Sequence, residues 1–365
     1  MEDETQEIKE LFIPQNNIHS FAETEKDFID VLKMFAPGTS LRTALDDLLR
    51  ARMGALIVFD NGNVFSIVER GFKINAKFTP QKLVELAKMD GAIILSRDGK
   101  KILSANTLLI PSADISTKET GTRHKAGERT AKQAKTIVIA VSERKNKISL
   151  YYKDISYRLE SSSEILRRAA ETLQILEKQK DSFNEMLDNL NTLELKRAVS
   201  VNDVCYFLQR AEIVKRVAEI VKRYLIELGQ EGVIVKMRLK ELLGNVQKEQ
   251  EIVLKDYLSS DSLYGLEMLE KMDFDFLLEP MNISRLLFEE LHDKHISPKG
   301  LRILSKINLL ERYIDSLIAN FGNLDKILIA KDKDLVKILD SDAMVAFFRE
   351  EIYNLKEKVS LGKRI

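Results

Sequence analysis

The sequence predicts an α/β (α+β) domain with a mixed central sheet, followed by an all-α helical spine and a small helical C-terminal domain. Up to residue 155, helical patterns alternate with short apolar runs and turn signals, which is typical of a sheet covered by helices. From 156 to 291 glycine is scarce and apolar residues recur every three or four positions, which indicates packed helices. Ser297-Pro298-Lys299-Gly300 then interrupts the pattern, so we expect domains at 1–155, 156–291 and 292–365.

The composition of the 365-residue chain, with 44% hydrophobic and 31% charged residues, is that of a folded protein with more than one core. No apolar run approaches the ~20 residues that a membrane span requires, and the acidic start is unlike a secretory signal, so we expect a cytoplasmic protein. A net charge of zero provides no long-range attraction to nucleic acid, so DNA binding would need a local basic patch. The single cysteine, Cys205, excludes an internal disulfide and a cysteine-based zinc site, and its apolar neighbours favour a buried structural thiol.

The first elements are expected to be two helices and a strand. Residues 1 to about 20 predict a poorly ordered arm or a short capping helix, and a first helix follows over 23–34. Thr39 or Ser40 can cap a second helix, whose apolar residues follow helical spacing. Residues 54–59, Gly-Ala-Leu-Ile-Val-Phe, form an apolar run short enough to be a buried strand.

The next segment predicts a hairpin and two further strands. Asp60-Asn61-Gly62-Asn63 is a strong hairpin signal, with residues 64–68 returning as a strand beside the first. Thr79-Pro80 predicts the start of a helix that runs to Lys88. Strands are then expected at 92–95 and at 101–110.

After a polar loop, the sequence predicts a helix at 128–135, a buried strand at 136–141 and an edge strand at 147–152. From about Tyr157, apolar residues at helical spacing predict one long helix or a pair of helices, and Asn202-Asp203 can cap the next one. We interpret these apolar stripes as the core of a helical bundle, with a partner groove as the alternative.

Two polar segments of the first domain carry the candidate chemistry. The first, residues 121–129, contains two guanidinium groups, an ammonium group and a histidine beside a helical pattern. A loop that runs into a helix N-terminus presents unpaired N–H groups and a partial positive charge, for which phosphate is the natural ligand. Thr122 can cap the helix, Gly121 allows close backbone approach, Arg123 can bind phosphate oxygens, and His124 and Lys125 add a proton donor and a charge. A surface salt-bridge cluster around Glu128 and Arg129 is the alternative.

The second segment, Asp90-Gly91-Ala92, lies where a predicted helix leads into a predicted strand. A carboxylate beside a glycine at such a junction is well placed to hold Mg²⁺ or Mn²⁺ at a strand end. An ordinary turn aspartate is the alternative. Together the two segments favour phosphoryl transfer, in which positioning and charge neutralisation do most of the catalysis.

Asp90-Gly91-Ala92 and Gly121-Thr122-Arg123-His124-Lys125, about thirty residues apart, resemble the paired DGA and RHR motifs of diadenylate cyclase domains. The helix and buried strand before them and Ile139-Ala140-Val141-Ser142 after them are similar in order. With the long helical middle and the Ser-Pro-Lys-Gly tail, the resemblance extends over nearly the whole chain to the DisA type of that family, the DNA integrity scanning proteins.

The resemblance implies an enzyme that joins two ATP molecules into cyclic di-AMP and releases two pyrophosphates, with Mg²⁺ or Mn²⁺ as cofactor. Two domains, each holding one ATP, would have to face each other, and the family implies a homo-octamer without a membrane partner. By motif position, the catalytic residues are Asp90, which also binds the metal, Thr122, Arg123 and His124. The nucleotide-binding residues are Gly91, Ala92, Leu109, Gly121, Lys125, Ser142 and Arg144.

Three positions of the cyclase domain depart from the family pattern. Lys125 replaces an arginine, which keeps the charge but loses the planar fork. Ala126 stands where a threonine is usual, and Glu143 could repel the triphosphate. The alternative function is therefore a catalytically weak nucleotide-binding sensor or a structural DNA-binding assembly.

The tail resembles a RuvA-like helix-hairpin-helix domain, for which branched DNA is the expected partner. Such modules bind DNA phosphate through the backbone of a Gly-hydrophobic-Gly hairpin. Here the matching turn is Asp340-Ser341-Asp342, whose carboxylates replace both glycines, so this hairpin should not bind phosphate in the usual way. A solvated helical surface, an oligomer contact or a protein-binding surface are the alternatives to DNA binding. The candidate basic face comprises Lys299, Arg302, Lys306, Lys331, Lys333 and Lys337.

Overall fold

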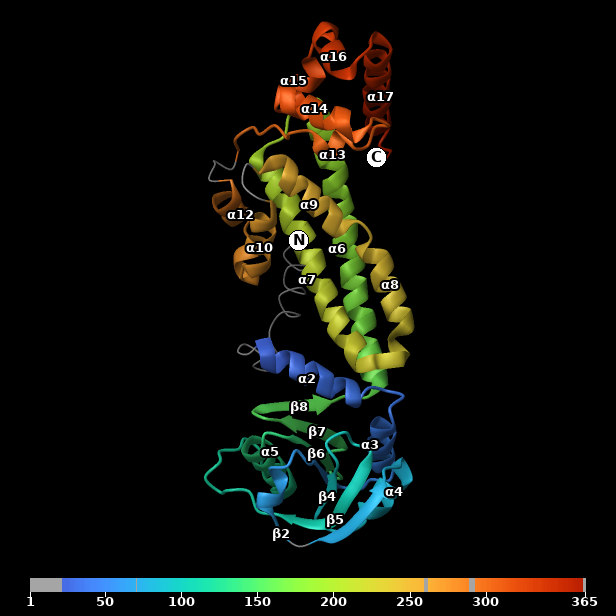
Figure 1. Ribbon diagram of the computed structural model, residues 1–365, viewed down its shortest axis with the longest axis vertical. Helices are drawn as coiled ribbons and strands as arrows, with labels where there is room; N and C mark the ends of the chain where they lie inside the picture. The colour runs from blue at the N-terminus through green and yellow to red at the C-terminus, as the bar shows by residue number, and fades with distance from the viewer. Residues whose placement is uncertain (1–21, 70, 259–261, 289–292, 364–365) are drawn as a thin grey trace. The chain divides into compact units, whose positions relative to one another are not determined.

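The computed structural model describes residues 22–69, 71–258, 262–288 and 293–363 (Figure 1). The predicted N-terminal arm lies outside these residues. The described chain forms two compact units. One unit contains the sheet and runs to Ala170, with a second segment at 222–236, and the other contains the remaining helices.

The sheet is mixed, as the sequence predicts. Within the described ranges it has eight strands, in the order β2-β5-β4-β1-β6-β7-β8 with β3 paired to β5. β1 is parallel to β4 and antiparallel to β6, and the other pairs are antiparallel. The strands are β1 (Ala55–Phe59), β2 (Val68–Glu69), β3 (Phe72–Lys77), β4 (Ala92–Leu95), β5 (Lys101–Leu109), β6 (Ile137–Ser142), β7 (Lys147–Tyr152) and β8 (Ile155–Leu159).

Helices cover both faces of the sheet (Figure 1). On one face α2 (Ala22–Met34), α3 (Ser40–Arg50) and α4 (Pro80–Leu86) pack against alternate residues such as Ile57. On the other face α5 (Thr122–Ala134) and the 3₁₀ turn η1 (Val64–Ile67) pack against the intervening residues, such as Val58. Because both faces of β1 are buried, the strand is apolar throughout, which explains the continuous run in the sequence.

The predicted hairpin strand at 64–68 is wrong. Residues 64–67 form η1 instead, and the turn before it is tied to α5, because the Asn61 side chain donates to the Ala134 carbonyl at 2.7 Å. Both edges of β1 are already paired, with β4 and β6, so no edge remains for a returning strand. The prediction of β7 as an edge strand is also wrong, because β8, which the sequence did not signal, pairs with its outer side.

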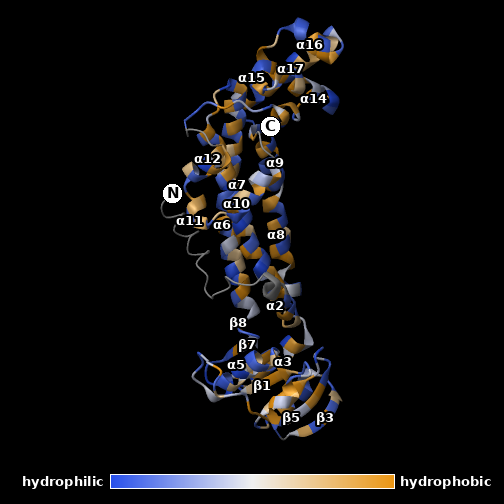
Figure 2. Cartoon of the chain, turned by 60° about the vertical axis from the view of Figure 1, so that its left-hand side comes forward, coloured by the Kyte–Doolittle hydropathy of each residue, from blue (hydrophilic) through white to orange (hydrophobic). Residues whose placement is uncertain are grey.

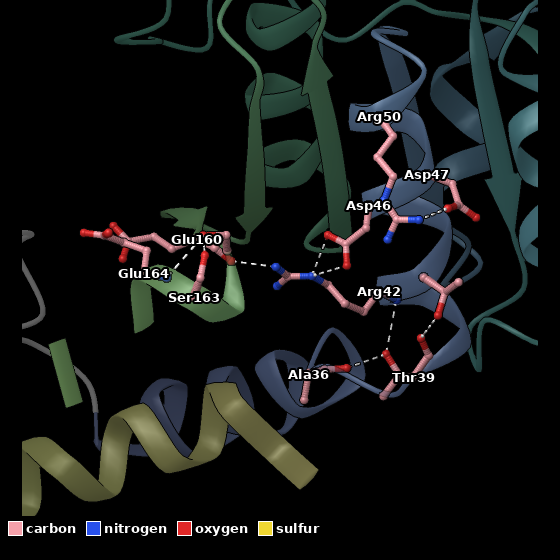
Figure 3. A network of polar contacts seen from close by, with 11 residues as sticks. Ala36, Thr39, Arg42, Asp46, Asp47, Arg50, Glu160, Ser163 and Glu164 are labelled. Carbon is pink, nitrogen blue, oxygen red and sulfur yellow. Dashed lines mark hydrogen bonds and ion pairs between the residues drawn. The ribbon is translucent and has the colours of Figure 1, made fainter. Parts of the chain in front are cut away.

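A buried arginine ties α3 to the end of the sheet (Figure 3). Thr39 caps α3 as predicted, accepting a hydrogen bond from the Arg42 amide. The Arg42 side chain is buried, and its Nε donates to Asp46 at 2.9 Å while Nη2 donates to the Glu160 carbonyl at 2.7 Å. Glu160 lies between β8 and α6, so this network fixes the point where the chain leaves the sheet.

After β8 ends at Leu159, the regular elements in the described part of the middle of the chain are helices, as predicted. Hydrophobic and hydrophilic residues alternate along α6 and α7 (Figure 2). Cys205 of α7 is buried, and this burial raises the pKa of its thiol to about 12, in agreement with a structural role. Ser200, rather than Asn202 or Asp203, caps α7. Its hydroxyl oxygen accepts a hydrogen bond from the Asp203 amide, and the Asp203 carboxylate accepts one from the Ser200 amide. The helices are α6 (Ser162–Lys196), α7 (Val201–Leu228), α8 (Val233–Leu243), α9 (Val246–Tyr257), α10 (Ser262–Lys271), α11 (Phe274–Leu277) and α12 (Pro280–Leu287).

The C-terminal helices form a core of their own that also includes Leu195 of α6. No helix in the described ranges combines the length and the hydrophobicity that crossing a bilayer requires. The helices of this region are α13 (Leu301–Leu304), α14 (Glu311–Phe321), α15 (Leu324–Ile329), α16 (Asp332–Leu339) and α17 (Asp342–Ser360).

Candidate functional site

The strand register brings the Asp90-Gly91 turn and Ser142 to the same end of the central strands. Leu56 pairs with Ala92, so the Asp90-Gly91 turn lies beside the start of β1. Ala55 pairs with Val141, which places Ser142 on the other side of that start. The Asp90-Gly91 turn, the start of β1 and the end of β6 are therefore adjacent, although they are distant in the sequence.

Gly91, which follows Asp90, has a backbone conformation that requires glycine. Its φ is +89°, and a Cβ would lie 2.9 Å from both the amide nitrogen and the carbonyl oxygen of Thr107. Asp90 is exposed at this turn. The side chain of Ala92 is fully buried in the core under α5, so any contact of this residue with a nucleotide would involve its backbone.

Helix α5 begins earlier than predicted, at Thr122. Gly121 is the N-cap residue and has no side chain to offer, so the prediction of Thr122 as the cap is wrong. The first helical hydrogen bond runs from the Lys125 amide to the Gly121 carbonyl at 2.8 Å. The preceding amides therefore have no acceptor within the helix, which leaves donors directed at an anion beside the basic residues of the first turn.

Arg123 and His124 lie half-buried in this first turn. The guanidinium of Arg123 rests against Gly54, whose missing Cβ would stand 2.9 Å from the Arg123 Cζ atom. Burial lowers the pKa of His124, and the nearby charges of Arg123 and Lys145 lower it further, against the opposing effect of Glu119. The imidazole is therefore neutral at neutral pH, with one nitrogen as donor and the other as acceptor.

The basic stretch divides into two parts with different roles. In its second part, Glu128 accepts from Lys132 at 2.7 Å and from Thr117 at 2.5 Å, and Arg129 donates to the Ile115 carbonyl at 2.9 Å. These contacts tie the 111–121 loop to α5. Glu128 does form an ion pair, as the alternative interpretation expected, but its carboxylate is buried, so the pair does not lie on the surface. In the first part, no carboxylate among the described residues pairs with Arg123 or Lys125, which leaves their charges available to a ligand.

The remaining predicted nucleotide-binding residues border the same edge. Leu109 is half-buried at the end of β5, beyond the Ala92–Thr107 pair. Ser142 ends β6 and accepts from the Lys145 amide at 3.2 Å, and Arg144 is exposed in the following turn. The sequence interpretation missed Gly54, although a glycine directly before an apolar strand was a usable signal of close approach.

The described residues contain no group of three or more histidine, cysteine or acidic side chains that could enclose a metal. Asp90 nevertheless fits a divalent cation held jointly by protein and substrate, since Mg²⁺ is commonly bound by one or two carboxylates together with substrate phosphates. Its carboxylate is exposed at the edge where Arg123 and the α5 N-terminus converge.

Three of the predicted DNA-binding residues have partners within the protein, and one of the three is buried. Arg302 is 1% exposed and pairs with the buried Glu194, so it cannot face DNA. Lys299 donates to the carbonyls of Lys255 and Leu258, and Lys306 is half-buried near Glu249. The assignment of Arg302 to a basic face is therefore wrong, because a sequence does not disclose charge partners on distant helices. Lys299 stays exposed and Lys306 half-buried, with their ammonium groups directed at protein partners.

The outer part of the predicted basic face remains on the surface. Lys331 and Lys333 are exposed, whereas Lys337 pairs with Asp334 at 3.1 Å. The predicted turn between helices is present, with Asp340 at a φ of +65° after α16 and Ser341 capping α17. The Asp340 carboxylate accepts from the Tyr313 hydroxyl at 3.0 Å.

Comparison with known proteins shows the family of this chain. The family described as "DisA bacterial checkpoint controller nucleotide-binding" matches residues 42–155, and "DisA bacterial checkpoint controller linker region" matches residues 159–292. The DNA integrity scanning protein DisA of Acetivibrio thermocellus is 44% identical over 320 residues, which cover 85% of this chain and 89% of that protein. The protein of the same name from Clostridioides difficile is 41% identical over 350 residues, 93% and 98% of the two chains. The chain therefore belongs to the family of DNA integrity scanning proteins of the DisA type.

Proposed function

We propose that this protein is a diadenylate cyclase that condenses two ATP molecules into cyclic di-AMP and releases two pyrophosphates. The observation that carries the proposal is the meeting of the Asp90-Gly91 turn, the Arg123-His124 pair and Ser142 at one sheet edge. A carboxylate, a helix N-terminus and an unpaired guanidinium at one place are what a nucleotide triphosphate with a divalent cation requires.

Each residue has a role that follows from its position. Asp90 would hold Mg²⁺ or Mn²⁺ and accept a hydrogen bond from the attacking 3′-hydroxyl, while the cation supplies charge neutralisation at the phosphates. Arg123, the neutral His124 and the first amides of α5 would hold the triphosphate of the bound ATP. Leu109 would contact the adenine, and Gly91, Thr122, Ser142 and Arg144 would border the nucleotide.

The reaction joins two nucleotides, so a single site is not sufficient. We propose that two cyclase domains face each other, so that the 3′-hydroxyl held by one domain attacks the α-phosphate held by the other. Self-association into a homo-octamer would provide these pairs. ATP is an intracellular substrate, which agrees with a cytoplasmic protein.

The tail is proposed as a DNA-sensing domain at 292–365, after a cyclase domain at 1–155 and a helical spine at 156–291. Relatives that match nearly their whole length carry the name DNA integrity scanning protein, which supports this role. Lys331 and Lys333 are the exposed candidates for phosphate contact. A tail that serves oligomerisation or a protein partner is the second candidate, favoured by the acidic turn at Asp340.

The test is a product assay with a matched pair of variants. The purified protein is incubated with ATP and either Mg²⁺ or Mn²⁺, and cyclic di-AMP is quantified by chromatography. Asp90→Asn is expected to abolish product, whereas Asp47→Asn, at a half-buried helix position paired with the exposed Arg50, should retain it. Binding of ATP without any cyclic di-AMP from the wild type would favour the nucleotide-sensor alternative.

A further inference from the structure

Gly54 precedes β1 and lies against the guanidinium of Arg123. A Cβ at this position would stand 2.9 Å from the Arg123 Cζ atom and 3.3 Å from Nη2, with Nη1 closer still. Observed Cβ atoms essentially never approach another heavy atom within 3.0 Å. The guanidinium therefore occupies the space that the side chain of any other residue would need.

We infer that Gly54 is a positioning residue for the reaction, which fixes the guanidinium of Arg123 at the centre of the nucleotide site. The register supports this, since Leu56 pairs with Ala92 and Ala55 with Val141. The residue before β1 consequently lies between the Asp90-Gly91 turn and the end of β6.

The guanidinium of Arg123 donates no hydrogen bond to the described part of the protein. No hydrogen bond or ion pair joins its side chain to another described residue. Arg129 on the same helix, by contrast, donates to the Ile115 carbonyl, and Arg42 donates to Asp46 and Glu160. A guanidinium that is positioned by contact with a glycine keeps its five donors for phosphate oxygens, which is a pre-organised binding group.

The geometry also indicates that Gly54→Ala displaces the guanidinium of Arg123 without disturbing the fold. The φ of Gly54 does not lie in the left-handed region, so alanine is compatible with the backbone, and the conflict is with the flexible end of Arg123. At Gly91 an added Cβ would instead meet the backbone of Thr107. Gly54→Ala therefore moves one guanidinium and leaves the sheet register in place.

The test is a double-mutant cycle on nucleotide binding. The ligand is α,β-methylene-ATP, which cannot release pyrophosphate, and the proteins are the wild type, Gly54→Ala, Arg123→Ala and the double variant. Gly54→Ala is expected to bind about ten-fold or more weakly, because the charge-assisted bonds of Arg123 are lost. In the Arg123→Ala background the same substitution should have no further effect, since the methyl group then has room.

Thermal unfolding of the four proteins provides the second readout. If Gly54→Ala lowers Tm, the double variant should recover the Tm of Arg123→Ala, because removing the guanidinium removes the conflict. Three results would overturn the inference. Gly54→Ala could bind the nucleotide with wild-type affinity, the substitution could weaken binding equally in the wild-type and Arg123→Ala backgrounds, or the lowered Tm could fail to recover in the double variant. The inference rests on the proposed function, but neither readout requires turnover. Absence of cyclic di-AMP would therefore contradict the cyclase and leave the Gly54–Arg123 coupling to be judged separately.

Discussion

Arg123 and Arg302 show how differently two arginines of one chain are used. Arg123 carries no partner among the described residues and rests on a glycine, as a ligand-binding group would. Arg302, which the sequence placed on a DNA-binding face, is buried and paired with Glu194, 108 positions away. The motif around Arg123 is local and could be read from the sequence, whereas the partner of Arg302 depends on tertiary packing.

His124 leads to a prediction about pH. Its folded pKa lies below 6.5, first because of burial and then because of Arg123 and Lys145, so the folded state binds fewer protons than the unfolded state. Its contribution to stability is complete above about pH 6.5 and is lost as the pH falls toward the folded pKa. His124→Gln should remove this dependence. Urea unfolding at pH 7.5, 6 and 5 should show a steeper loss in the wild type, and parallel losses would contradict the assignment.

At the level of elements, the sequence succeeded where a signal is local. Thr39 and Thr79 cap α3 and α4 as predicted, because a cap depends on a few adjacent residues. The hairpin after β1 failed because the turn residues could not disclose that both edges of β1 are paired. β3 was missed although its apolar residues Phe72, Ile74 and Ala76 alternate with polar ones, which is the pattern of a half-buried strand.

The junction between the helical spine and the tail is a buried polar network. Asp256 accepts from the amides of Leu301 and Arg302, both at 2.7 Å, and thereby holds the start of α13. Glu194 accepts from Arg302 and from the Tyr257 hydroxyl, the latter at 2.6 Å. Three elements distant in sequence, α6, α9 and α13, are therefore fixed to one another inside one compact unit.

This network predicts that Arg302 acts in stability. Arg302→Ala would leave Glu194 buried without its partner, which costs about 3–5 kcal/mol in comparable buried pairs. Lys333→Ala, on the exposed face of the tail, is the matched control and should change the free energy of unfolding by about 0.5 kcal/mol or less. Chemical denaturation of both variants measures the difference. Equal stability of the two variants would show that the pair does not secure the junction.

On the scale of the whole molecule, DNA recognition must rely on few charges. The chain has no net charge, and Lys299, Arg302 and Lys306 are engaged by the protein. Replacing both Lys331 and Lys333 with alanine should therefore weaken binding to branched DNA and reduce the salt dependence of log K by about two. Binding across a salt series measures this slope. An unchanged slope in the double variant would mean that another surface contacts the DNA. Absence of binding by the wild type at low salt would favour the oligomer or protein-partner role of the tail.

The three-part layout of the chain was predictable because sheet, spine and tail differ in periodicity over long stretches. The candidate site was predictable as two motifs, while their meeting place required the pairing of β1 with β4 and β6. Sequence spacing alone does not show which strand lies between two others. Gly54 lies at that meeting place, and although a glycine before an apolar strand signals close approach, the structure was needed to show that its neighbour is Arg123.

The measurement that tests the central claim most directly is the product stoichiometry of the wild-type protein with ATP and Mn²⁺ or Mg²⁺. Cyclic di-AMP and pyrophosphate are quantified in the same samples over time. A cyclase that joins two nucleotides across facing domains must release two pyrophosphates for each cyclic di-AMP. That ratio, lost together with all product in Asp90→Asn, is the predicted result. Release of inorganic phosphate without a cyclic dinucleotide, or no product with either metal, would contradict the proposed reaction.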